Sequence, residues 1–215
     1  MIRRALFGAA AITAIAAAGV PATRTVRGGE AAQITPSLKL VHTVRGNTLR
    51  VDWPTLSSIN VQRGFRYAGA HRFILRNVAD AEQHAFAEVD AGGAITRFYW
   101  FQFESLLPDR PGGYDYSKDA ALTLAGLEWR TNVRRYTTPA EPDGDQAALY
   151  SLFAAHGWRQ PLPALRARIV HVPADDPRQE LMIIYAEATP ASAPPTQKES
   201  ADLLARAQAG LRLIR

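Results

Sequence analysis

The stretch Ile95-Thr-Arg-Phe-Tyr-Trp-Phe-Gln-Phe-Glu-Ser-Leu106 decides the fold of this chain. A half-buried strand alternates apolar and polar side chains with a period of two, whereas this stretch is apolar at both parities. The pattern predicts a central strand that is covered on both sides. Its five aromatic side chains would divide between the two faces: Phe98 and Trp100 on one, and Tyr99, Phe101 and Phe103 on the other.

The segments around this strand carry further strand patterns bounded by turn residues. We expect strands at 38–44, 49–53, 65–76, 82–89, 122–136, 165–172 and 181–188, with a possible bulge at Gly69. Two helices are predicted late in the chain. The first spans 145–156, and the second follows a capping box at Thr196–Glu199.

The second predicted helix has an apolar stripe at helical spacing, formed by Leu203, Leu204, Ala207, Leu211 and Ile214. Helices do not alternate with strands, which excludes a parallel α/β arrangement. The sequence therefore predicts an α+β fold. It would be a curved antiparallel sheet of about seven strands, with a late helix and a C-terminal helix packed on it.

The first 22 residues are typical of a secretory signal peptide. Arg3 and Arg4 precede an apolar run of about 16 residues, short of the roughly 20 that span a bilayer, and Val20-Pro21-Ala22 fits a cleavage site. We expect a leader at 1–22, a flexible lead-in at 23–34 and a single domain at 35–215. This organisation predicts a periplasmic or secreted protein without a membrane span after cleavage, with an uncleaved anchor as the alternative.

Composition excludes several classes of function. The chain has no cysteine, so it has no disulfide framework, thiolate metal site or cysteine nucleophile. Without the two leader arginines, 23 basic residues face 20 acidic ones, a net charge of +3. These basic residues are scattered, which argues against nucleic acid as a partner. No fingerprint for a nucleotide, a serine nucleophile or a metal is present, so we expect no cofactor and no metal.

Cross-strand arithmetic places candidate site residues on one face of the sheet. A loop at 91–93 makes paired positions sum to 184, which sets His84 opposite Trp100, and an earlier turn pairing Arg76 with Ala81 sets His71 opposite Phe86. A loop at 91–94 would instead set His84 opposite Phe101. The first register gathers Tyr67, His71, Phe73, Glu82, His84, Phe86, Phe98, Trp100, Gln102 and Glu104.

Such a face resembles the aromatic lining of a ligand pocket, with Tyr67, His71, Phe73, His84, Phe86, Phe98, Trp100 and Gln102 as the binding residues. The first hypothesis is an exported binding or accessory module for an apolar small molecule or a protein partner. The second is an enzyme that uses His84 with Glu82 or Glu104 as an acid–base pair. The third is a structural protein of the cell envelope, in which the histidines are inert core residues.

Residues 107–117 form a long loop with two prolines, two glycines, Tyr114 and Tyr116. Loops of this length often cover a site, and a simple crossover is the alternative.

Overall fold

The computed structural model describes residues 38–138, 144–190 and 193–215, all of which belong to one compact unit. The predicted leader and lead-in lie outside the described residues. No described helix combines the length and the hydropathy that crossing a membrane requires.

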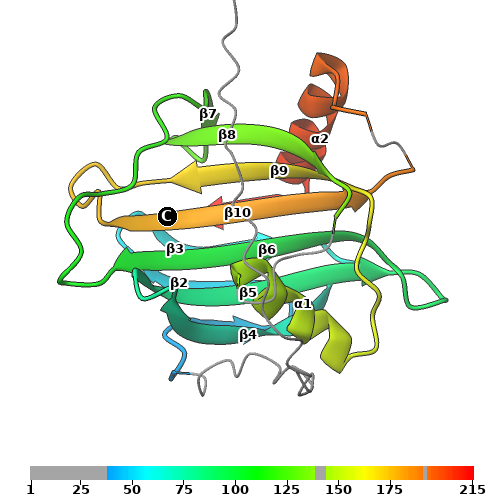
Figure 1. The fold of residues 1–215 in the computed structure, drawn as a ribbon, viewed down its shortest axis with the longest axis horizontal. Helices are drawn as coiled ribbons and strands as arrows, with labels where there is room; N and C mark the ends of the chain where they lie inside the picture. The colour runs from blue at the N-terminus through cyan, green and yellow to red at the C-terminus, as the bar shows by residue number, and fades with distance from the viewer. Residues whose placement is uncertain (1–37, 139–143, 191–192) are drawn as a thin grey trace, which may run out of the picture. The chain divides into compact units, whose positions relative to one another are not determined.

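Seven antiparallel strands form the main sheet, which confirms the predicted α+β class (Figure 1). β6 (Ile95–Leu106) lies inside this sheet, between β5 (Ala79–Val89) and β10 (Gln179–Ala188). The order across the sheet continues on one side to β4 (Arg66–Leu75) and on the other to β9 (Ala164–His171), β8 (Leu127–Tyr136) and β7 (Ala120–Leu124).

A second sheet of four antiparallel strands was not anticipated. It consists, in order, of β1 (Thr43–Arg45), β2 (Thr48–Trp53), β3 (Leu56–Val61) and β11 (Leu211–Ile214). The strand expected at 49–53 ends before Pro54, and no strand was predicted at the position of β3. The buried side chains of β3 are Leu56, Ile59 and Val61, whose spacing is not a regular alternation.

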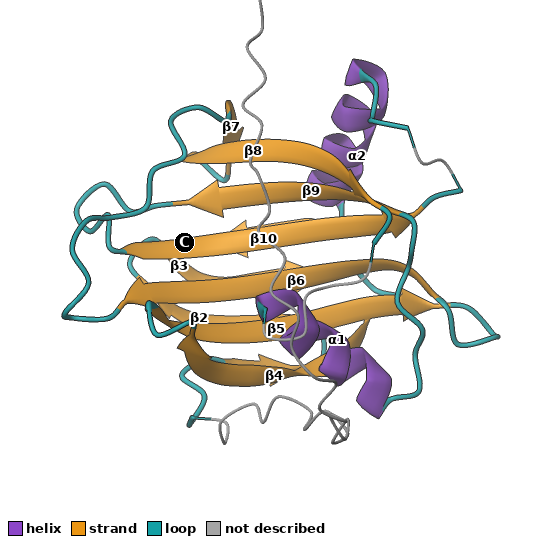
Figure 2. Ribbon diagram, in the orientation of Figure 1, coloured by secondary structure: helices purple, strands orange, loops and turns teal. Residues whose placement is uncertain are grey.

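The main sheet is covered on both faces (Figure 2). Tyr99, Phe101 and Phe103 pack into a core shared with the second sheet. Phe98 and Trp100 pack on the opposite face with Leu149, Leu152 and Phe153 of α1 (Asp145–Ala155). The predicted division of the aromatic strand is therefore confirmed, and so is the first helix.

The second helix is shorter than its apolar stripe suggested. α2 (Gln197–Ala209) begins with the predicted capping box, and its buried residues are Leu203 and Ala207. The Tyr99 hydroxyl donates to the Ala207 carbonyl at 2.8 Å, and a Cβ at Gly210 would overlap that hydroxyl. The chain leaves the helix at this point. Leu211 and Ile214 belong to β11, so assigning them to the helix was wrong.

Two registers differ from the first prediction because the turns differ. Arg76 and Asn77 adopt positive φ angles, so the chain reverses early and Leu75 pairs with Ala79. The turn between β5 and β6 agrees with the longer of the two predicted loops, 91–94, because His84 pairs with Phe101. The predicted bulge at Gly69 is present, where the β4–β5 register shifts by one residue.

Candidate functional site

The predicted site residues do not share one face. Tyr67, Glu82, His84 and Phe86 face the second sheet, whereas His71, Phe73, Phe98, Trp100, Gln102 and Glu104 face α1. The grouping on a single face was wrong because a slip of one residue in register moves a side chain to the opposite face. Whether any of these residues binds a ligand remains a prediction.

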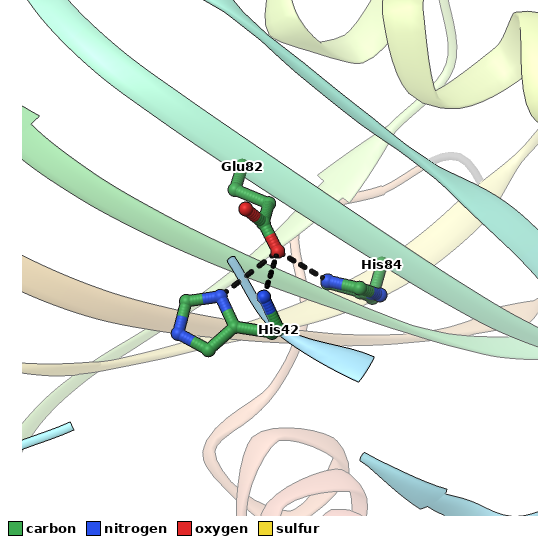
Figure 3. Close-up of side chains that lie close together, drawn as sticks. All are labelled: His42, Glu82 and His84. Atoms are coloured by element: carbon green, nitrogen blue, oxygen red, sulfur yellow. Dashed lines mark hydrogen bonds and ion pairs between the residues drawn. The ribbon is translucent and has the colours of Figure 1, made fainter. Parts of the chain in front are cut away.

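One predicted pair does come together. Glu82 and His84 are two positions apart on β5, so their side chains project from the same face. His84 Nε2 lies 2.8 Å from Glu82 Oε1 (Figure 3). Glu104, the other proposed partner of His84, projects from the opposite face and accepts a hydrogen bond from Gln102. Of the two carboxyl groups proposed as partners of His84, the structure therefore places only that of Glu82 within hydrogen-bond distance.

His42 completes this cluster, and the sequence reading gave it no role. It precedes β1 and places Nδ1 at 2.9 Å from Glu82 Oε1. The backbone amides of Val41 and His42 donate to the same carboxylate at 2.7 and 2.9 Å. No local signal predicts this contact, because it joins residues 40 positions apart.

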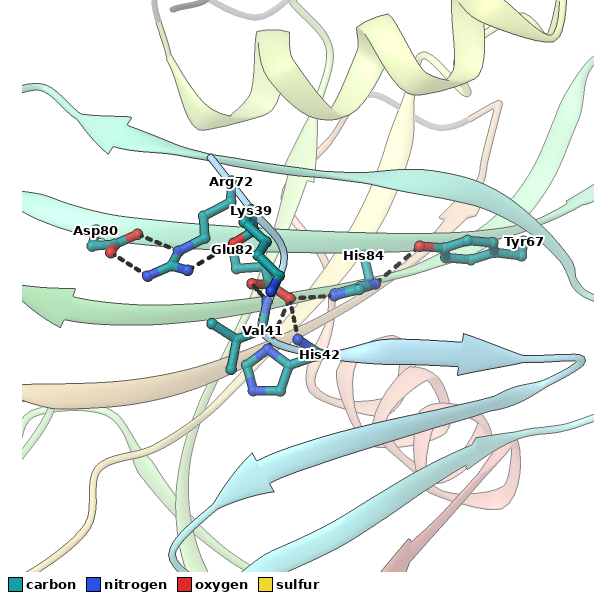
Figure 4. A network of polar contacts seen from close by, with 8 residues as sticks. All are labelled: Lys39, Val41, His42, Tyr67, Arg72, Asp80, Glu82 and His84. Atoms are coloured by element: carbon teal, nitrogen blue, oxygen red, sulfur yellow. Dashed lines mark hydrogen bonds and ion pairs between the residues drawn. The ribbon is translucent and has the colours of Figure 1, made fainter. Parts of the chain in front are cut away.

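The cluster extends to a fourth side chain, Tyr67, whose hydroxyl lies 3.0 Å from His84 Nδ1 (Figure 4). An ionised carboxylate only accepts hydrogen bonds, so His42 Nδ1 and His84 Nε2 carry the protons that they donate to Glu82. His84 Nδ1 then accepts from the Tyr67 hydroxyl. This assignment gives the His84 imidazole a neutral tautomer, with its proton on Nε2.

Electrostatics support an ionised Glu82 and a neutral His84. Burial alone would raise the pKa of Glu82, but the hydrogen bonds from His42, His84 and two backbone amides together hold that pKa far below its ordinary value. Burial lowers the pKa of His84. The cluster is thus a buried anion surrounded by four N–H donors.

A second set of contacts fixes the segment that carries His42. Arg72 pairs with Asp80 at 2.7 Å and donates to the Lys39 carbonyl at 2.8 Å (Figure 4). The His42 ring stacks on Phe103 with centroids 3.9 Å apart. The segment before β1 is therefore attached to β4, β5 and β6 mainly through polar groups.

The chemistry open to this cluster is limited by access. His84 is 1% exposed, and both of its ring nitrogens are engaged. His42 Nε2 is buried and has no hydrogen-bond partner among the described residues. His42 and Glu82 line a cavity of about 130 Å³. One ligand atom from each of His42, Glu82 and His84 lies within 4.8 Å of the others, a spacing that one metal ion could use. Hydrogen bonds already account for this spacing.

A larger cleft lies beside the loop that follows β6. Its volume is about 570 Å³, and its walls come from that loop, the β7–β8 turn, β8, and the end of β9 with the residues after it. Tyr114, Tyr116, Leu127 and Val172 provide apolar surface. Arg130 and His171 provide polar groups, and so do three carboxylates, those of Asp115, Glu128 and Asp175. The loop at 107–117 therefore contributes two tyrosines to a cleft.

Two buried carboxyl groups anchor this loop. The Tyr114 hydroxyl donates to Glu104 Oε2 at 3.0 Å, and Tyr116 hydrogen-bonds Glu180, which pairs with Glu104 across β6 and β10. Burial, followed by the charge of Glu104, raises the pKa of Glu180 to about 8. Burial also raises the pKa of Glu104.

His171 at the cleft wall is held in one orientation. Its Nδ1 donates to the Glu128 carbonyl at 2.9 Å, and its ring lies 5.1 Å from that of Trp129. Nε2 faces the Thr55 hydroxyl at 3.4 Å, a weak contact that a ligand could replace. Sequence alone placed His171 in a strand and gave it no role.

The chain matches no protein-family model, and comparisons with curated proteins and with solved structures found no significant similarity.

Proposed function

We propose that this protein is an exported binding module that holds a small amphipathic molecule in the cleft beside Tyr114 and Tyr116. The observation that carries the proposal is the cleft itself, about 570 Å³ in volume. Sites for small molecules are typically clefts of about 300–1,000 Å³ with apolar walls and a few polar groups. The cleft falls within this size range, and its lining combines apolar side chains with charged ones, among them Arg130, Asp115, Glu128 and Asp175.

Rigid attachment of the loop supports binding. Tyr114 is held at both its backbone and its hydroxyl, because its amide donates to the Pro177 carbonyl at 2.8 Å and its side chain bonds to Glu104. A cleft that is already formed loses little conformational entropy when a ligand enters, which favours affinity.

Two of the expectations from sequence have less support, namely a ligand on the aromatic face and an acid–base enzyme that uses His84. Trp100 is 2% exposed beneath α1, so the aromatic strand offers little open surface to a ligand. His84 is buried and fully hydrogen-bonded, so it has no free nitrogen for a substrate. The Glu82 cluster is best explained as an attachment for the segment that precedes β1.

Export is the second half of the proposal, and it rests on the sequence of residues 1–22. N-terminal sequencing of the protein recovered from outside the cytoplasm tests it. We expect a mature chain that begins near Thr23. An intact Met1 in the membrane fraction would contradict cleavage.

Ligand binding can be tested with N-phenyl-1-naphthylamine, a neutral amphipathic dye that fluoresces when it leaves water. We expect saturable binding at one site. The substitution Ala174→Trp places a large side chain at an exposed position of the cleft wall and should weaken binding at least about tenfold by filling the cleft. The matched control is Ala91→Trp, also exposed but in the β5–β6 turn. Absence of saturation, or an equal loss in both variants, would refute the cleft as the site.

A further inference from the structure

Arg166 of β9 is a buried guanidinium with no acidic partner among the described residues. It is 4% exposed, and its guanidinium carbon lies 4.0 Å from the centroid of the Tyr136 ring and 5.8 Å from that of Tyr150. Its Nη groups meet neutral partners only, the Tyr150 hydroxyl and the Gln146 side-chain amide. Its Nε has no hydrogen-bond partner.

An unpaired buried charge is costly, because desolvation of an ion costs several kcal/mol unless a counter-charge offsets it. Cation–π contacts with the surrounding rings recover only part of this, about 0.5–2 kcal/mol each. The charge of the Asp145 carboxylate acts on Arg166. The oxygens of that carboxylate, however, accept hydrogen bonds from the backbone amide of Gln146 and from the side-chain amide of Gln102. Within the part of the chain that the structure describes, no oxyanion therefore bonds directly to this guanidinium.

A small cavity lies against this side chain. Its volume is about 60 Å³, and its lining includes Arg134, Arg168 and Asn132 as well as Arg166. The acidic group near these side chains is Asp119, which pairs with Arg168 at 2.6 Å and accepts from Asn132 at 3.3 Å. Three guanidinium groups thus line the cavity, and among the described residues only that of Arg168 forms an ion pair with a carboxylate.

The cavity lies on the face of the main sheet that carries α1. That helix contacts β4 and β5, and its Tyr150 and Gln146 side chains reach Arg166 of β9 beside the cavity (Figure 2). Arg134 on β8 and Arg166 on β9 are direct cross-strand partners, so their side chains project to the same side. Arg134 is exposed, which gives an ion in solution a charged group at the entrance.

We propose that this cavity binds a small oxyanionic group, such as a carboxylate, a phosphate or a sulfate. A guanidinium presents paired N–H donors that match the oxygens of such groups, and Arg166 has Nε to offer. Asn132 adds a neutral side-chain amide. The volume admits one group rather than a whole metabolite, so the ligand is a free inorganic anion or the terminal oxyanion of a larger molecule. This inference does not depend on the proposed function of the cleft.

The test is titration of the full-length protein with sodium phosphate and, separately, with sodium acetate. Ionic strength is held constant with sodium chloride, and binding is followed by calorimetry. We expect saturable binding of at least one anion. Arg166→Met should weaken it about 10–100-fold, the worth of a hydrogen bond to a charged group. This variant should fold, because replacing a buried charge with an apolar side chain of similar length is often neutral or stabilising.

Two further variants make the result decisive. Arg134→Gln changes an exposed residue at the cavity and should weaken binding by a smaller factor. Arg50→Met removes an exposed arginine on β2 and should leave the affinity unchanged. Preference for phosphate over acetate would identify a tetrahedral oxyanion as the ligand class, and the reverse preference would identify a carboxylate.

The proposal is overturned if neither anion binds beyond the chloride background. It is also overturned if Arg166→Met binds as tightly as the unaltered protein, or if Arg50→Met loses as much affinity. If Arg166→Met does not fold, Arg134→Gln decides, and an unchanged affinity in that variant refutes the site. Failure of the dye to bind the cleft would leave this outcome untouched.

Discussion

Replacing Glu180 with glutamine should make the stability of the protein less dependent on pH. Glu180 is 2% exposed, lies opposite Glu104, and leaves Oε2 without a hydrogen-bond partner. Burial, and then the charge of Glu104, raises the pKa of its carboxyl from 4.5 to about 8. Between pH 4.5 and about 8, Glu180 therefore keeps its proton in the folded protein and releases it in the unfolded chain.

The sign and size of the effect follow from proton linkage. The pKa of Glu180 is higher in the folded protein than in the unfolded chain. Its contribution to stability is therefore fully present below pH 4.5 and is lost as pH rises toward 8. One proton gives a slope of about 1.4 kcal/mol per pH unit, or about 5 kcal/mol over the whole window. Glutamine has a similar size and does not ionise, so Glu180→Gln should remove this loss.

The assay is urea unfolding of both proteins at several pH values between 5.5 and 7.5. The free-energy difference between Glu180→Gln and the unaltered protein should grow by about 1.4 kcal/mol per pH unit in favour of the variant. Burial lowers the pKa values of His71 and His84, and their titration cancels because both proteins contain them. The exposed change Glu128→Gln serves as the control. A difference that does not vary with pH would refute the reasoning.

Two further substitutions test the packing of the described chain. Glu82→Gln replaces one accepting oxygen by an amide that cannot accept from the Val41 or His42 donors, and urea unfolding should show a loss of about 1.5–3 kcal/mol; a loss under about 0.5 kcal/mol would mean that the cluster does not attach the preceding segment. Gly210→Ala places a Cβ against the Tyr99 hydroxyl and should destabilise the protein by about 1–3 kcal/mol in thermal melts. Gly92→Ala, whose Cβ would keep an ordinary contact of 3.4 Å, is its matched control, and equal melting temperatures would contradict the packing described at Gly210.

The parts of the fold that sequence predicted are those governed by local pattern. Continuous apolar character at both parities identified β6 as covered on both faces, and the structure divides its aromatic residues as expected. The Thr196–Glu199 box fixed the start of α2, because both capping hydrogen bonds lie within four residues. These signals need no knowledge of the rest of the chain.

The parts that sequence missed depend on distant contacts. The candidate site residues were predicted on one face, which was wrong, because the face that a strand residue occupies depends on turn length. One residue more or less in the loop at 91–94 decides whether His84 pairs with Trp100 or with Phe101. His42 contacts Glu82 through a segment that no pattern directs to β5. Leu211 and Ile214 fit helical spacing equally well, and the packing of Tyr99 against α2 decides where that helix ends.

The pairing of β11 with β3 imposes an order on assembly during synthesis. β1, β2 and β3 leave the ribosome early, but the free edge of β3 has no partner until residues 211–214 emerge. An unpaired strand edge above an apolar face is a template for association with other chains. The nascent chain must therefore protect Leu49 and Ile59 from aggregation while β4 to β10 are made, and proteolytic loss of the last strand would reopen the same edge.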